Sequence, residues 1–378
     1  MLPNTKSHFL GSASSESGFE NGLQSSGLGL PNDVALECLV RVPFNQFSTA
    51  ESVCRGWKVE IELPEFRRHR KAAGLTRSIV VASQSRVDNT RNRLAFKLSG
   101  MPVYRLTICE PDTGNWSELP PVREFSNGLP MFCQLIGVGS DLVVMGGCDP
   151  VNWEVSNSVF VYNFVSCKWR RGADMPGGRR SFFACTSDLD HTVFVAGGHD
   201  DEKNALRSAT AYDVATDKWV PLPDMARERD ECKGIFRGGK FHVIGGYCTD
   251  RQGRFERSAE AFDVATWQWS QVEENFLETG TCPRTFTNGA DGRIYMCRED
   301  NVVTVTGNTW QAVAKLPAEV SSVAYVTTWQ DKLLVMASAN FGEPHIAYLM
   351  DMKKYTWTKV DAPEEYSGHV QSSCCLEI

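Results

Sequence analysis

The chain has 378 residues, of which 42% are hydrophobic, 10% aromatic and 22% charged, a composition typical of a soluble globular protein with a sizeable core. Its formal net charge of -7 gives no overall attraction to nucleic acid or to an anionic membrane. No apolar run approaches the roughly 18 residues that span a bilayer, and the amino terminus lacks the pattern of a secretion signal. We therefore expect a protein of the cytoplasm, the nucleus or both.

Residue types that form metal and cofactor sites are scattered along the chain. The 13 cysteines are odd in number and include no Cys-x-x-Cys pair, and the seven histidines show no metal-binding spacing. Phosphate-loop, dinucleotide-binding and nucleophile-elbow motifs are also missing from the sequence. We expect reduced, mostly buried thiols, no cofactor, no metal and no catalytic role, although a catalytic triad of residues distant in sequence stays open.

The first part of the chain changes character near residue 27. Residues 1–26 are rich in Ser, Gly and Asn, and we expect a disordered tail there. Residues 27–74 show helical periodicity: a helix that starts near Asp33 and ends at Pro43, a second that starts with a capping box at residues 48–51, and a third over 65–71. Three short helices make a poor independent core, which leaves apolar surface for a partner.

This helical segment contains Leu30-Pro31-x-Asp33-Val34, then Leu39 and Val42-Pro43, and then Ser52-Val53-Cys54-Arg55-x-Trp57-Lys58. With these residues it resembles an F-box, the three-helix module that docks onto the Skp1 adaptor of a cullin-RING ubiquitin ligase. The alternative is a generic helical cap on the following domain. The resemblance implies that adaptor contacts come from a set of mostly apolar residues: Leu30, Pro31, Asp33, Val34, Leu39, Val42, Pro43, Val53, Cys54 and Trp57.

From residue 75 to 378 the chain consists of strand-length runs separated by turn residues. Tryptophan recurs at intervals of about 50 residues, and such a period indicates a repeat architecture. Its six positions are Trp116, Trp169, Trp219, Trp269, Trp310 and Trp357. An apolar or aromatic residue lies seven positions before each of them, and a Gly-Gly pair follows an apolar strand in three repeats. The pattern predicts a mainly β fold, a six-bladed propeller in which the aromatic residues pack between the sheets.

The hydrophobic strand that ends in Gly-Gly, the following Tyr/Phe-Asp and the spaced Trp resemble kelch repeats. The first repeat shows only three strands, while residues 369–378 have strand character and are too few for a blade. We therefore expect the C-terminal strand to complete the first blade as its inner strand and so to close the ring.

Binding residues are expected on the loops at one end of the propeller, after the second strand of a blade and before its first strand. Arginine before successive blades also suggests a shared anion-binding ring. The candidate target-binding residues are Trp153, Arg179, Arg180, His199, Asp200, Lys203, Arg207, Arg227, Arg229, Asp230, Arg254, Phe255, Arg257, Arg284, Phe341 and His345.

The order of the two modules resembles the plant F-box/kelch-repeat family. Asp174-Met175-Pro176, Gly245-Gly246-Tyr247 and residues 365–371 are similar to the group of that family called Kiss Me Deadly. This resemblance implies a substrate-recognition subunit of an SCF ubiquitin ligase that binds Skp1, and through it cullin, and that delivers target proteins for degradation. Phenylalanine ammonia-lyase and type-B response regulators are the targets that it implies. Two alternatives stay open: an enzyme or small-molecule sensor that uses the propeller channel, and a scaffold whose partner is not degraded.

Overall fold

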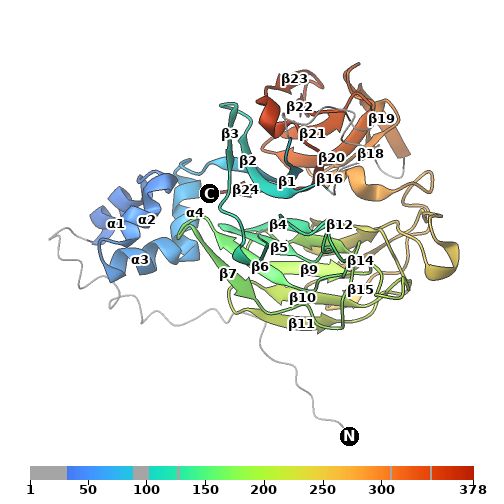
Figure 1. Cartoon of the computed structure of the whole chain (residues 1–378), viewed down its shortest axis with the longest axis horizontal. Helices are drawn as coiled ribbons and strands as arrows, with labels where there is room; N and C mark the ends of the chain where they lie inside the picture. Colours follow the sequence, from blue (N-terminus) through green and yellow to red (C-terminus); the bar gives the residue numbers. More distant parts are fainter. Residues whose placement is uncertain (1–31, 88–101, 126–127, 307–308, 341–342) are drawn as a thin grey trace, which may run out of the picture. The chain divides into compact units, whose positions relative to one another are not determined.

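The computed structural model describes residues 32–87, 102–125, 128–306, 309–340 and 343–378 (Figure 1). The predicted tail and three predicted site residues, Leu30, Pro31 and Phe341, lie outside this part of the chain. The chain divides into two compact units, Met1–Leu75 and Thr76–Ile378. Among the helices of the described residues, none combines the length and the apolar character needed to cross a membrane.

The described part of the first unit is helical, and its core is small. Its elements are α1 (Asn32–Val40), the 3-10 helix η1 (Phe44–Gln46), α2 (Phe47–Glu51), α3 (Arg55–Glu62) and α4 (Pro64–Ala72). Leu39, Phe47, Ile61 and Phe66 are buried, and the rings of Phe47 and Phe66 meet edge to face with centroids 5.6 Å apart. Four short helices thus share one apolar centre.

One buried arginine ties the ends of these helices together. The Arg70 guanidinium donates hydrogen bonds to the carbonyl oxygens of Val40 (2.5 Å), Val42 (2.8 Å) and Leu75 (2.8 Å). It also lies 4.8 Å from the centre of the Phe47 ring. Burial lowers the pKa of Arg70. The carbonyls at the end of α1, which have no partner inside the helix, are satisfied in this way.

The second predicted helix is divided in two. Residues 48–51 lie inside α2, so the predicted capping box does not form, and α3 begins separately at Arg55. Cys54 caps α3, because its Sγ accepts a hydrogen bond from the backbone N–H of Trp57 at 3.5 Å. Pro64 begins α4, where its missing N–H costs nothing. The unit therefore has four α-helices in its described residues, where the sequence pattern predicts three.

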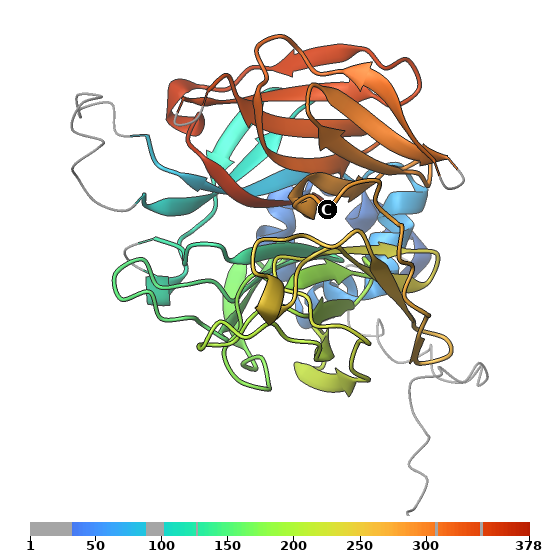
Figure 2. The same ribbon diagram turned by 90° about the vertical axis from the view of Figure 1, so that its right-hand side faces the viewer.

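The described residues of the second unit form six four-stranded antiparallel sheets, the predicted propeller blades (Figures 1 and 2). Blade 1 contains β1 (Ser78–Ser85), β2 (Tyr104–Glu110), β3 (Asn115–Glu118) and β24 (Val370–Glu377). Blade 2 contains β4 (Gln134–Val138), β5 (Asp141–Met145), β6 (Val159–Asn163) and β7 (Lys168–Gly172). Blade 3 contains β8 (Ala184–Ser187), β9 (Thr192–Ala196), β10 (Ala209–Asp213) and β11 (Lys218–Leu222).

The remaining blades follow the same order along the chain. Blade 4 contains β12 (Lys233–Arg237), β13 (Lys240–Ile244), β14 (Ala259–Asp263) and β15 (Gln268–Trp269). Blade 5 contains β16 (Phe286–Asn288), β17 (Ile294–Arg298), β18 (Asn301–Thr306) and β19 (Thr309–Lys315). Blade 6 contains β20 (Ser322–Trp329), β21 (Lys332–Ser338), β22 (His345–Asp351) and β23 (Trp357–Val360). The mainly β, six-bladed fold is confirmed.

The two ends of the propeller sequence meet in blade 1. Strand β24 pairs with β1 in antiparallel register from Ser78 opposite Glu377 to Gln84 opposite Val370. It takes the inner position that the first strand of each other blade occupies. In both views the first blade, in cyan, lies beside the sixth, in red (Figures 1 and 2). The predicted closure by the C-terminal strand is confirmed, and it removes two open sheet edges.

The six tryptophans link each blade to the one before it. The indole N–H of each donates a hydrogen bond to a backbone carbonyl in the outer strand of the preceding blade or in the segment that follows that strand. The pairs are Trp169 to Pro120 (2.8 Å), Trp219 to Ala173 (2.8 Å), Trp269 to Pro223 (2.6 Å), Trp310 to Phe276 (2.9 Å), Trp357 to Lys315 (2.8 Å) and Trp116 to Asp361 (2.9 Å). The last pair joins blade 1 to blade 6, so the period in the sequence is a ring of hydrogen bonds in the fold.

The glycine pairs end the second strand of blades 2, 3 and 4. Gly198 has a φ of +81°, and a Cβ at this position would lie 2.3 Å from the carbonyl oxygen of Ser181. Gly246 has a φ of +82°, and its Cβ would lie 2.6 Å from the carbonyl oxygen of Asp230. Only glycine permits this close approach. The pairs therefore hold the segment before the first strand against the loop after the second strand, where binding residues are expected.

Candidate functional site

The loops after β5, β9 and β13 and the segments before β4, β8 and β12 lie at one end of the propeller, here named the loop face. Contacts between the two groups of loops show their proximity. His199 Nδ1 lies 2.9 Å from a carboxylate oxygen of Asp230, and Arg227 Nη1 lies 3.0 Å from Glu256 Oε2. The geometry predicted for these loops is therefore present.

The tips of these loops carry different chemistry on a similar backbone. Trp153 and Lys203 have a positive φ of 61° and 66°, and Gly253 has a φ of 75° at the corresponding place. In blade 2 the tip is apolar, with Val151 78% and Trp153 55% exposed. In blade 3 the tip is charged, because Asp200 orders the turn through hydrogen bonds to backbone N–H groups and Lys203 is exposed. The loop face thus varies from blade to blade.

The arginines before β8 and β12 are part of the scaffold. Arg229 Nη1 donates to the carbonyl oxygens of Gly245 (2.7 Å) and Ser258 (3.1 Å), and its Nη2 donates to Ser258 Oγ (2.9 Å). Arg180 makes the equivalent bonds to the carbonyl oxygens of Gly197 (3.3 Å) and Ser208 (3.2 Å) and to Ser208 Oγ (2.9 Å). Each guanidinium thus joins the end of the second strand to the start of the third.

Burial removes both arginines from any binding surface. Arg229 also forms an ion pair with Glu260 at 3.1 Å, and the two side chains are 1% and 0% exposed. Burial lowers the pKa of Arg180. The recurrence of arginine led us to expect an anion-binding ring, and this expectation is wrong for Arg180 and Arg229. Their guanidinium groups bind backbone carbonyls, and Arg229 also binds Glu260.

His199 and Asp230 also belong to the interior. Both oxygens of the Asp230 carboxylate lie within 3.0 Å of His199 Nδ1, and both side chains are about 5% exposed. A carboxylate that orients a histidine in this way is found in catalytic bases as well as in cores. The backbone of Ser181 pairs with that of His199, and Ser181 Oγ lies 3.8 Å from Cys148 Sγ. Because the side chains of His199 and Asp230 are both buried, we assign this pair to packing rather than to target binding.

Two aromatic residues of the loop face were not among the predicted target-binding residues. Phe132 and Phe182 precede β4 and β8 with a positive φ of 61° and 53°, and Glu231 has a φ of 50° at the same place before β12. The rings of Phe132 and Phe182 are 4.9 Å apart, and Phe132 is 40% exposed. A positive φ on a non-glycine residue costs about 1–3 kcal/mol, and such strain collects at functional sites. Aromatic residues before two successive blades are the signal that could have found them.

Blade 4 contributes a hollow to the loop face. An open pocket of about 540 Å³, here named the arginine pocket, is lined by Arg227, Arg251, Arg254, Phe255, Glu256, Arg257, Ser258, Glu274 and Gly280. Four of the predicted target-binding residues, Arg227, Arg254, Phe255 and Arg257, meet here. Arg251 is an addition that the sequence alone did not single out.

The other predicted loop residues lie apart from this pocket. Arg179 and Arg207 are exposed and face Glu154 (4.0 Å) and Asp224 (3.3 Å). Arg284 is exposed. Burial lowers the pKa of His369, and the positive charge of Arg284 lowers it further. Burial, followed by the effect of His369, lowers the pKa of His345 to about 4.

His345 has a structural contact of its own. Its Nδ1 accepts a hydrogen bond from the backbone N–H of Val370 at 3.2 Å, where β24 begins. Its ring centroid lies 4.9 Å from that of His369, whose Nδ1 is 3.0 Å from the Tyr104 hydroxyl. These contacts connect blade 6 to the strand that closes the ring, so His345 serves the closure of the propeller.

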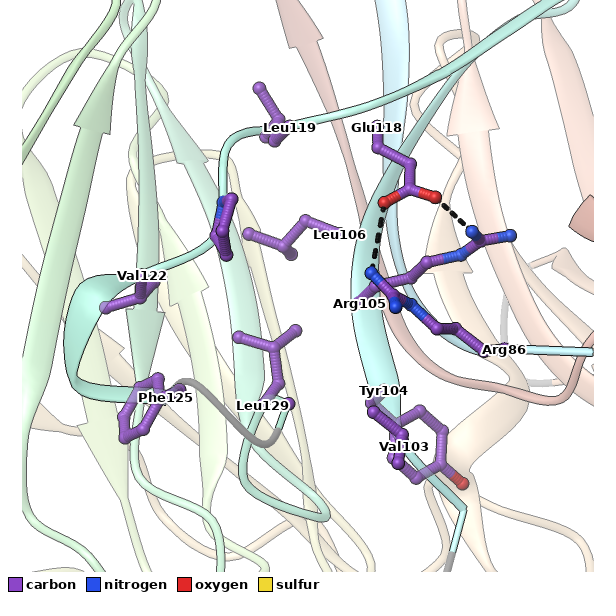
Figure 3. A pocket seen from close by; sticks show the side chains of 12 residues that line it. Arg86, Val103, Tyr104, Arg105, Leu106, Glu118, Leu119, Val122, Phe125 and Leu129 are labelled. Carbon is purple, nitrogen blue, oxygen red and sulfur yellow. Dashed lines mark hydrogen bonds and ion pairs between the residues drawn. The ribbon is translucent and has the colours of Figure 1, made fainter.

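A smaller pocket lies between blade 1 and the segment that leads to blade 2 (Figure 3). Its volume is about 90 Å³. Leu106, Leu119, Val122, Phe125 and Leu129 form one wall, and Glu118 lies opposite with Arg105 and Arg86 as its ion-pair partners. Sequence reasoning did not identify this pocket.

The predicted adaptor residues of the helical unit divide by exposure. Val34 and Val53 are 42% and 57% exposed, and Asp33 and Pro43 are also exposed. Val42, Cys54 and Trp57 are half-buried, and Trp57 Nε1 is buried without a hydrogen-bond partner among the described residues. Leu39 was expected to contact the adaptor, but it is 2% exposed and belongs to the core of the helical unit. Val59 and Leu63 are exposed apolar residues that the motif did not include.

The described residues offer little to a metal ion. No group of three or more His, Cys, Asp or Glu side chains in that part of the chain is placed to hold one. What the loop face offers instead is a set of exposed aromatic and charged side chains on a rigid ring, which suits recognition of another protein.

Comparison with known proteins agrees with this geometry. The family described as the KLHDC2/KLHL20/DRC7 Kelch-repeats domain matches residues 133–307. F-box/kelch-repeat protein At1g15670 of Arabidopsis thaliana is 51% identical over 353 residues, which cover 92% of this chain and 98% of that protein. F-box/kelch-repeat protein At1g80440 of the same plant is 47% identical over 354 residues, which cover 92% and 98%. The chain therefore belongs to the F-box/kelch-repeat proteins.

Proposed function

We propose that the chain is the substrate-recognition subunit of an SCF-type ubiquitin ligase. The observation that carries this proposal is its likeness to F-box/kelch-repeat proteins over 98% of the length of two relatives, which spans both units. In this function the helical unit binds a Skp1-type adaptor, and through it cullin. The propeller binds the target protein, while the ubiquitin-loading enzyme binds elsewhere in the ligase, so this chain needs no catalytic residue.

The exposed apolar residues of the helical unit support the adaptor half of the proposal. Val34 on α1 and Val53 between α2 and α3 leave apolar surface uncovered on a unit with a small core. Leu30 and Pro31, which precede α1, complete the predicted contact. Burial of such side chains against an adaptor contributes about 1.5–3 kcal/mol for each large aliphatic residue.

A pair of matched substitutions tests the adaptor contact. Val53 and Val59 are both 57% exposed, but Val53 alone belongs to the F-box motif. We expect Val53→Asp to abolish co-purification with a Skp1-type adaptor, and Val59→Asp to retain it, with both variants folded by circular dichroism. Retention of the adaptor by Val53→Asp would contradict the proposed contact.

Degradation of the target is the second half of the proposal. Phenylalanine ammonia-lyase and type-B response regulators are the targets implied by the resemblance to the Kiss Me Deadly group, and they stay predictions. We expect a bound target to fall in abundance when this chain is expressed and to recover when the proteasome is inhibited. A bound target whose abundance does not change would instead indicate a stoichiometric scaffold.

A further inference from the structure

We propose that the arginine pocket binds a short acidic segment of the target protein, with clustered carboxylate or phosphate groups facing Arg251, Arg254 and Arg257. This inference rests on the proposed function and specifies the chemistry that the propeller recognises. The three arginines come from one loop, between β13 and β14, and all three are exposed. They contribute to the lining of a pocket of about 540 Å³.

Within the described part of the chain, these three arginines form no ion pair. Some exposed arginines elsewhere on the propeller face acids, as in the ion pairs of Arg171 with Asp174 (2.8 Å) and Arg207 with Asp224 (3.3 Å). No carboxylate of the described residues lies within ion-pair distance of Arg251, Arg254 or Arg257. Arg257 donates to the backbone carbonyl of Glu278, at 3.4 Å. In a chain of net charge -7, this is a local concentration of available positive charge.

Other lining residues of the pocket are ordered by ion pairs among themselves. Arg227 binds Glu256 at 3.0 Å and Glu274 at 2.5 Å, and Ser258 Oγ donates to Glu256 at 2.9 Å. Burial raises the pKa of Glu256, but the hydrogen bonds from Ser258 and Arg227 outweigh burial, so the pKa is lowered overall. Glu256 therefore stays ionised and keeps Arg227 in place. Four arginines against two glutamates leave an excess of two positive charges for a ligand.

The size and wall of the pocket favour a peptide segment. Phe255 is half-buried and meets the Tyr247 ring edge to face at 5.4 Å, which gives the pocket an apolar wall beside its charges. Arginine binds carboxylate and phosphate through paired N–H donors, and both groups fit this arrangement. Because the three arginines are exposed, salt should weaken the interaction.

Binding of labelled peptides to the full chain, purified with its Skp1-type adaptor, tests the proposal. The probes are a short fluorescein-labelled peptide rich in Glu, the same peptide with phosphoserine at each Glu, and the same peptide with Gln at each Glu. We expect one or both anionic peptides to bind and the Gln peptide to bind at least about tenfold more weakly, a difference of about 1.4 kcal/mol. The stronger of the two anionic peptides identifies the source of the charge.

A triple variant assigns the binding to the pocket. Changing Arg251, Arg254 and Arg257 to Gln should weaken anionic-peptide binding at least about tenfold. The matched control changes Arg171, Arg237 and Arg293 to Gln, three exposed arginines outside the loop face, and should leave binding within about twofold. Equal losses in the two triple variants, or no binding of either anionic peptide, would overturn the pocket proposal. If the peptide results fail in this way while the native chain still binds the adaptor, the proposed function stands. If the native chain does not bind the adaptor, the proposed function is overturned.

Discussion

Two sets of arginines lie at the same end of the propeller and have opposite roles. Arg180 and Arg229 precede the first strands of blades 3 and 4, are buried, and donate to the carbonyls around the glycine pairs. Arg251, Arg254 and Arg257 lie on one irregular loop, are exposed, and have no acidic partner in the described residues. The same side chain thus serves the scaffold in one set and faces solvent in the other.

The buried arginines recur at equivalent positions in successive blades, whereas the exposed arginines do not. Arg180 and Arg229 occupy equivalent positions in successive blades and make equivalent bonds, to Ser208 and to Ser258. A residue that returns with the period of the fold is required by the fold. Recognition needs chemistry that differs from blade to blade, so it should be sought in residues such as Arg254 that break the period.

The largest effect on stability should come from the buried ion pair. Arg229→Met leaves the Glu260 carboxylate buried without its cation, which typically costs about 3–5 kcal/mol. We expect a corresponding fall in the free energy of unfolding, measured by urea denaturation of the propeller. Arg227→Met, in which a half-exposed arginine is lost, should cost less than about 1 kcal/mol. Similar costs for the two variants would contradict the scaffold role of Arg229.

A smaller effect is expected where the glycine pair meets the segment before the first strand. Gly198→Ala places a Cβ 2.3 Å from the Ser181 carbonyl oxygen, whereas Gly178→Ala, at a φ of +92°, meets no atom within 4 Å. Both variants carry the cost of a left-handed backbone, about 1–2 kcal/mol. We expect Gly198→Ala to cost a further 1–3 kcal/mol, roughly the cost of overpacking. Equal melting temperatures of the two variants would show that the close approach is unimportant.

Acid should weaken the closure of the ring through His345. Burial and then His369 lower its pKa to about 4 in the folded chain, below the ordinary value of 6.5. The folded chain therefore favours the neutral imidazole of His345. Its contribution to stability is fully present above pH 6.5 and is lost as the pH falls toward 4. We expect the melting temperature to fall over this interval, and less steeply in His345→Gln. The exposed residue His191 gives the control, because His191→Gln should retain the native slope.

The fold could be predicted from the sequence where a residue type recurs with the blades. The six tryptophans, from Trp116 to Trp357, predict six blades because each indole must reach the preceding blade. The short first repeat predicts ring closure because an unpaired edge strand needs a partner. The break between α2 and α3 could not be predicted, since the pattern from Ala50 to Ile61 continues through it and only Cys54 capping marks the new start.

The candidate site could be predicted only in part. Loop positions placed Arg227, Arg254, Phe255 and Arg257 at one end of the propeller, and they line one pocket. The burial of Arg229 depends on Glu260, which lies on β14 and has no local sequence signal for an ion pair with it. Phe132 was missed because its positive φ arises from the tertiary structure rather than from a residue type that favours it.

A joint measurement of stability and binding tests the separation of the two sets most directly. The melting temperature and the affinity for the Glu-rich or phosphoserine peptide would be determined for Arg229→Met and for the variant with Arg251, Arg254 and Arg257 changed to Gln. We predict a lowered melting temperature for the first, and for the second a native melting temperature with binding weakened at least about tenfold. A triple variant that melts as low as Arg229→Met, or that binds the peptide like the native chain, would contradict the assignment of these arginines to recognition.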